Sequence, residues 1–125
     1  MNRSANEVVL MPKSKRIAVA AYSSEKEGRY LERLVPDSNR MLDVYAGTIQ
    51  PGGGQNPEEP SQHEGEELCY VLSGKLNFII DGKNYLVEAG DLIYYPSNFK
   101  HSFRNLGPEL STAIWVEMMV GDPPV

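Results

Sequence analysis

The two histidines of this 125-residue chain, His63 and His101, are the residues best suited to chemistry. Each lies next to turn-forming residues in a segment with strand character, and Glu67 follows His63 by four residues. If the two segments face each other across a small barrel, both imidazoles and the carboxylate meet at one point. Such a set suits a divalent first-row metal ion and leaves positions open for water, substrate or oxygen. The sequence therefore predicts a metal site formed by His63, Glu67 and His101.

A site without metal is the alternative for the same three side chains. They would then hydrogen-bond to one another and to a ligand inside an otherwise apolar barrel. A buried glutamate needs a partner in either case, because an unpaired charge is costly to remove from water. The sequence does not fix the ion, so iron, zinc, nickel, manganese and cobalt all stay open.

Strand alternation separates the acidic residues around Glu67. Successive side chains point to opposite faces of a strand, so Glu66 points away from Glu67 whereas Cys69 shares its face. We expect Glu64 and Glu66 to be rim or surface charges, and Cys69 to be a small buried filler. The residue types for a nucleophilic triad with Ser61 are present, but their spacing fits the metal set better.

Length and composition predict one domain over residues 1–125, with 41% hydrophobic and 23% charged residues. The net charge of −5 argues against binding nucleic acid, which requires lysine and arginine to neutralise phosphates. No apolar stretch is long enough for a membrane span. Cys69 is the single cysteine and nothing resembles a signal peptide, so we expect a cytoplasmic protein.

Short alternating segments separated by glycine and proline predict an all-β sandwich or barrel. Asp81-Gly82 predicts a tight hairpin, because a type I′ turn needs residues that tolerate positive φ. Residues 29–35 stay ambiguous. The predicted strands are residues 8–11, 16–22, 41–50, 68–72, 75–80, 85–87, 92–95, 99–104 and 112–120.

The segment of residues 51–60 is rich in glycine and proline and forms neither a helix nor a central strand. It leads directly to His63, which favours a loop over the mouth of a pocket rather than a plain linker. We expect most of the aromatic residues to be core and one or two to line that pocket. They are Tyr45, Tyr94, Tyr95, Phe99, Phe103 and Trp115.

Two separated stretches resemble the two motifs of the cupin superfamily, the double-stranded β-helix or jelly-roll barrel. The second histidine, the glutamate and the closing glycine of the first motif correspond to His63, Glu67 and Gly74. The glycine, proline, histidine and asparagine of the second motif correspond to Gly90, Pro96, His101 and Asn105. The resemblance implies an all-β cupin barrel with a core of roughly residues 40–120, and a metal held by the two histidines and the glutamate.

Two positions depart from the cupin pattern. Ser61 stands where the first motif has its first histidine, so one usual ligand is missing. Asn98 stands where the second motif has a glycine, a mild change because asparagine tolerates left-handed backbone comparatively well. The trio of His63, Glu67 and His101 is what remains.

The sequence is also similar to a narrower group, the small-molecule-sensing C-terminal cupin domains of bacterial regulators with an N-terminal helix-turn-helix. Residues 65–67, 70–74 and 101–105 carry this similarity. We find no helix-turn-helix in this sequence, so we expect a free-standing relative or a fragment of a larger regulator.

Three functional hypotheses follow, and whether the protein is an enzyme stays open. The first is a sensor or binding module that holds a divalent metal and a small polar or acidic molecule in its barrel. The second is a metal-dependent oxygenase, isomerase or lyase that uses the two-histidine, one-glutamate site. The third is a self-associating barrel with a vestigial site. The resemblance also implies a homodimer, with the N-terminal strands of residues 8–22 as the segment exchanged between copies.

Overall fold

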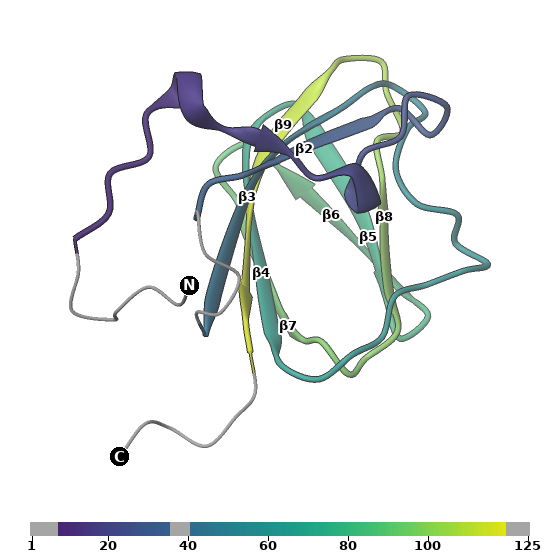
Figure 1. Cartoon of the computed structure of the whole chain (residues 1–125). Helices are drawn as coiled ribbons and strands as arrows, with labels where there is room; N and C mark the ends of the chain where they lie inside the picture. The colour runs from purple at the N-terminus through teal and green to yellow at the C-terminus, as the bar shows by residue number, and fades with distance from the viewer. Residues whose placement is uncertain (1–7, 36–40, 120–125) are drawn as a thin grey trace.

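The computed structural model describes residues 8–35 and 41–119, in which the strands form two antiparallel sheets that face each other (Figure 1). The larger sheet has the strand order β1-β2-β3-β9-β4-β7, and the smaller has the order β6-β5-β8. The strands are β1 (Ile17–Ala18), β2 (Arg29–Arg33), β3 (Leu42–Ile49), β4 (Glu66–Ser73), β5 (Lys75–Ile80), β6 (Lys83–Glu88), β7 (Leu92–Pro96), β8 (His101–Arg104) and β9 (Ser111–Met118). This architecture confirms the predicted all-β jelly-roll barrel.

Alternation along the strands places one set of side chains between the sheets. On β4, Glu67, Cys69 and Val71 are buried whereas Glu66 and Tyr70 are exposed. The predicted orientation of Glu66, Glu67 and Cys69 is therefore confirmed. The buried apolar set is Leu31, Tyr45, Ile49, Cys69, Val71, Leu76, Phe78, Ile80, Val87, Tyr95, Phe103, Ala113 and Trp115.

Turn chemistry sets the connections between strands. Asp81 and Gly82 have φ values of 51° and 84° and join β5 to β6, which confirms the predicted hairpin. Gly74 separates β4 from β5 with φ of 70°, and a Cβ there would lie 2.5 Å from Ser111 Oγ. Glycine at this position allows both the left-handed backbone and the close approach of the start of β9.

The N-terminal region differs from the prediction. Val8–Met11 forms no strand, because a strand exists through its partner and no segment in the described part of the chain pairs with these residues. Within the predicted strand of residues 16–22, only β1 is a strand, followed by the 3₁₀ turn η2 (Ala20–Tyr22); η1 (Lys13–Lys15) precedes it. The ambiguous residues 29–35 contain β2, which pairs with β3. The end of the predicted last strand, Val120, lies outside the described residues.

No helix in the described ranges is long and apolar enough to cross a membrane.

Asn105 fixes the turn after β8 and offers a test of the fold. Its side chain is 1% exposed, donates to Ile49 O (3.0 Å) and Glu109 O (2.7 Å), and accepts from Gly107 N (2.8 Å). We predict that Asn105→Ala lowers the free energy of unfolding by about 2–4 kcal/mol, because it leaves buried backbone groups unpaired. Urea denaturation measures this loss.

The matched control is Asn84→Ala, since the exposed Asn84 side chain only accepts a hydrogen bond from Asn77. We expect a change within about 0.5 kcal/mol there. Equal stability losses in the two variants would contradict the assigned role of Asn105.

Candidate functional site

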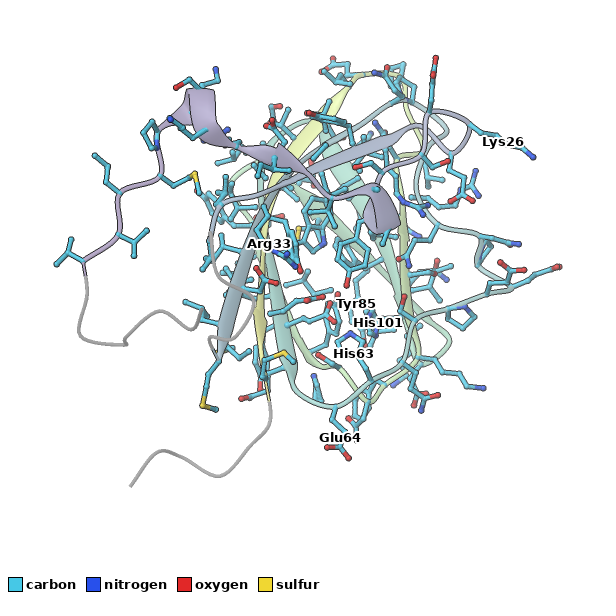
Figure 2. All side chains as sticks on the ribbon, viewed as in Figure 1. Lys26, Arg33, His63, Glu64, Tyr85 and His101 are labelled. Atoms are coloured by element: carbon cyan, nitrogen blue, oxygen red, sulfur yellow. The ribbon has the colours of Figure 1, made fainter. Side chains whose placement is uncertain are left out.

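The two sheets bring His63, Glu67 and His101 together, as the sequence predicted. Glu67 lies on β4 of the larger sheet, His101 begins β8 of the smaller, and His63 lies in the segment that enters β4. One ligand atom from each residue lies within 4.8 Å of the other two. Figure 2 shows the labelled His63 and His101 close together, and their ring centroids are 5.4 Å apart.

His63 differs from the prediction in lying outside a strand, yet backbone contacts fix its position. Its N–H donates to Ser97 O at 3.0 Å, beyond the end of β7. Ser61 forms an isolated antiparallel bridge with His101. Ser61 N donates to His101 O at 2.8 Å, and His101 N donates to Ser61 O at 2.9 Å. Ser61 supplies no imidazole, but its backbone links the segment of one histidine to the other.

Glu67 Oε1 is the point of convergence. It lies 2.6 Å from His63 Nε2 and 3.2 Å from His101 Nε2, while Oε2 accepts a 2.8 Å hydrogen bond from Tyr95 OH. Glu67 and His101 are 4% and 5% exposed, whereas His63 lies at the rim. Among the described residues, no group gives Oε1 a hydrogen bond of acceptable geometry. The carboxylate is held firmly through one oxygen, and the other is left for a different partner.

The Nδ1 atoms of the two imidazoles indicate which kind of partner Glu67 Oε1 can take. His63 Nδ1 lies 3.1 Å from Glu64 O, and His101 Nδ1 lies 2.7 Å from Phe99 O. A carbonyl oxygen only accepts, so each Nδ1 carries a proton, and each ring presents a lone pair at Nε2 once that nitrogen gives up its own proton to a competing metal ion. Three lone-pair atoms therefore converge, with each imidazole oriented by a backbone carbonyl as in metal-ligating histidines. The donor set fits a divalent metal ion.

Electrostatics favours the charged forms of Glu67 and His101. Burial raises the pKa of Glu67, but His101 and the hydrogen bond from Tyr95 outweigh it and hold that pKa below its ordinary value. Burial lowers the pKa of His101, but Glu67 and the Phe99 carbonyl outweigh it and raise that pKa overall. Burial, together with the Glu67 charge, raises the pKa of Tyr95 and keeps its hydroxyl a donor.

A cavity of about 270 Å³ adjoins the trio. Four of the aromatic residues listed from the sequence line it, rather than the one or two expected, while Tyr94 and Phe99 are exposed. Gln55 of the 51–60 loop reaches its wall and donates to Ser61 Oγ at 2.9 Å, which agrees with a loop over the mouth. The lining is Ala21, Tyr22, Arg29, Leu31, Tyr45, Gln55, Ser61, His63, Glu67, Tyr95, His101, Phe103, Trp115 and Glu117.

An inner row of carboxylates crosses the larger sheet beside the cavity. Glu117 of β9 lies opposite Glu67 of β4 on one side and opposite Asp43 of β3 on the other. Arg33 binds Asp43 through two nitrogens, at 2.9 and 3.2 Å, and Tyr45 OH donates to Asp43 at 2.6 Å. Burial, followed by the Glu67 charge, raises the pKa of Glu117.

Sequence reasoning missed Tyr22, Arg29 and Glu117 as cavity residues. Tyr22 was assigned to a strand, but it lies on η2, which folds over the cavity. A signal for Glu117 was present, because it shares a face with Trp115 two residues earlier on β9. Arg29 carried no such signal, since the segment containing it was ambiguous. Cys69 is fully buried, as the filler interpretation expects.

Comparison with known proteins places these features in a family. The profile of the cupin domain family matches residues 46–117, more than half of the chain. The HTH-type transcriptional regulator PuuR of Escherichia coli (strain K12) is 36% identical over 67 residues, which are 54% of this chain and 35% of the regulator. The match thus covers about a third of the length of this relative.

Solved structures share the fold. The cupin domain of an XRE family transcriptional regulator from Enterobacter cloacae superposes with a TM-score of 0.67 and 21% identity, over 75% of this chain and 99% of that one. The iron(II) form of HppE superposes with a TM-score of 0.75 and 18% identity, over 94% of this chain and 64% of that one. The family profile spans strands of both sheets and includes His63, Glu67 and His101. We conclude that this chain belongs to the cupin domain family.

Proposed function

We propose that this protein is a small cupin that holds a divalent metal through His63, Glu67 and His101 and binds a small polar or acidic molecule beside it. One observation carries the proposal. The two imidazoles are turned by carbonyl contacts so that their Nε2 atoms meet Glu67 Oε1, which has no hydrogen-bond partner of acceptable geometry in the described part of the chain. A cation bound there would satisfy all three atoms at once.

The residues around the trio have separable roles in this proposal. Tyr95 holds Glu67 in one orientation, and the carbonyls of Glu64 and Phe99 fix the two rings. The bound ion would act as a Lewis acid that polarises a ligand oxygen. The apolar wall of the cavity, with Trp115 and Phe103, limits water around the ligand.

We favour a sensor or binding module of the regulator type. The similarity to PuuR and to the XRE family regulator domain supports it, since in both proteins the name describes a transcriptional regulator. Ligand occupancy would then be passed to a partner or to a DNA-binding domain outside this sequence. The alternative is a metal-dependent cupin enzyme, an oxygenase, isomerase or lyase, and the cavity that reaches all three candidate ligands favours it.

We also propose that two copies associate in the cytoplasm through the outer face of the larger sheet. This face carries an exposed apolar patch on β4 and β7, which we call the outer patch: Tyr70, Leu72, Leu92 and Tyr94. The N-terminal segment stands off the barrel in Figure 1, with Val8 98% and Leu10 86% exposed. Within residues 8–35 and 41–119, both this apolar segment and this apolar face are exposed, and a second copy would cover them.

The metal site is tested by metal content. We expect the wild-type protein to bind close to one equivalent of zinc or iron, and His101→Ala to weaken that binding by more than about 100-fold, since loss of a supporting contact alone costs about 10–100-fold. Elemental analysis after dialysis gives the stoichiometry. Glu66→Gln, on the opposite face of β4, is the control that should bind like the wild type. Wild-type protein that takes up neither ion overturns the proposal.

The pH dependence of stability distinguishes metal-free from metal-bound protein. Without metal, the raised pKa of His101 contributes stability that is present below its ordinary value of 6.5 and lost as pH rises through the folded-state pKa. The lowered pKa of Glu67 contributes stability that is present above 4.5 and lost as pH falls. We therefore expect the melting temperature of the metal-free protein to decrease as the pH rises from about 6 to about 8.

Added zinc should reverse that trend, because a ligating imidazole must be neutral. The rise in melting temperature on adding zinc should therefore grow from pH 6 to 8, as measured by scanning calorimetry. A zinc effect that does not change with pH would contradict ligation by the histidines.

The proposed dimer is tested by mass in solution. We expect light scattering to give twice the chain mass of 13.9 kDa for the wild type, and a single chain mass for the double variant Leu72→Lys, Leu92→Lys. Two charges placed in the outer patch would face the partner copy unpaired. Leu106→Lys, an exposed leucine on a loop, is the control that should stay dimeric. A monomeric wild type would contradict the proposal.

A further inference from the structure

Glu117 differs from the other polar groups of the cavity wall. It extends from β9 beside Trp115, lies across the sheet from Glu67, and lines the cavity, but it is not one of the three residues whose ligand atoms cluster. Its side chain is half-buried. No hydrogen bond or ion pair joins it to any described residue.

The neighbouring polar groups have partners within the protein. Arg29 donates to Tyr22 O at 2.9 Å and Gly54 O at 2.7 Å and also pairs with Glu27. Asp43 is paired with Arg33, and Gln55 with Ser61. The cationic group that lines the cavity is therefore already neutralised, and the carboxylate of Glu117 is the charge left facing the space.

A metal ion in the trio would give the cavity two ends of opposite sign. The double positive charge exceeds the single negative charge of Glu67, so the trio would attract a ligand anion. Glu117, on the next strand, would attract a cation. A simple carboxylic acid satisfies the first end and leaves Glu117 unpaired beside a second anion, which is unfavourable at a half-buried site. A ligand with both charges satisfies both ends.

We propose that the ligand is a small zwitterionic amino acid, with its carboxylate at the trio and its ammonium at Glu117. This inference rests on the proposed metal-binding function and narrows its ligand class. The cavity of about 270 Å³ sets the size, equal to about nine water molecules at about 30 Å³ each. Glu67, 4% exposed, has an Oε1 atom without a hydrogen-bond partner in the described ranges, and the cation bound there would form the positive end of the cavity.

The test compares matched ligands with and without the ammonium group. Zinc-loaded, dialysed protein is titrated calorimetrically with glycine, β-alanine and 4-aminobutyrate, and with acetate, propionate and butyrate, and zinc retention is checked afterwards. We expect at least one amino acid to bind the wild type at least tenfold more tightly than its matched acid. In Glu117→Gln this preference should fall below threefold, with zinc content unchanged. Glu109→Gln, an exposed carboxylate outside the cavity, should behave like the wild type.

Several results would overturn the inference: no preference for amino acids in the wild type, a preference that survives in Glu117→Gln, or loss of zinc in that variant, which would make Glu117 a metal ligand. A separate titration of metal-free protein with propylammonium keeps the two proposals distinguishable. Weakening of this binding by Glu117→Gln supports the ammonium site even if the protein takes up no metal. Equal propylammonium binding in both proteins counts against Glu117 whatever the metal content.

Discussion

The meeting of two imidazole nitrogens at a single buried carboxylate oxygen is the constraint on which the site depends. Glu67 reaches that point because β4 lies between β7 and β9, so that Tyr95 fixes one oxygen and the sheet supports the strand on both sides. A shift of β4 by one residue would put Glu66 inside and Glu67 outside, and the site would be lost. The register that assembles the core therefore also assembles the candidate metal site.

Much of the fold and of the candidate site could be predicted, because the spacing of residues along a strand determines which side chains share a face. Alternation on β4 placed Glu67 and Cys69 on one face, and a two-residue Asp-Gly turn fixed the β5–β6 hairpin. The separation of His63 from His101 gained meaning from the resemblance to cupins, since a barrel returns distant strands to the same place. Where local rules and topology agree, as on β4 and β5, the predicted elements match the structure closely.

The rest could not be predicted because it depends on partners that sequence alone does not name. Val8–Met11 has the composition of a strand but no strand beside it in the described chain, and Tyr22 reaches the cavity through a 3₁₀ turn that its strand-like sequence did not indicate. The position of Glu117 opposite Glu67 depends on the pairing of β4 with β9, which are separated by four other strands in the chain. Likewise, only the folded structure shows that Arg29 is already paired with Glu27.

The loop that carries Gln55 is attached to β8 at both ends, through the bridge of Gly54 to Arg104 and that of Ser61 to His101. Residues between these two anchors can change in type or number without moving either histidine, because both anchors are backbone contacts. Gly54 itself cannot change, since its φ is 137° and a Cβ there would lie 2.2 Å from Phe103 O. Evolution could therefore alter which ligand the barrel binds while leaving the candidate metal site intact. In a scaffold organised in this way, ligand selectivity and metal binding can evolve separately.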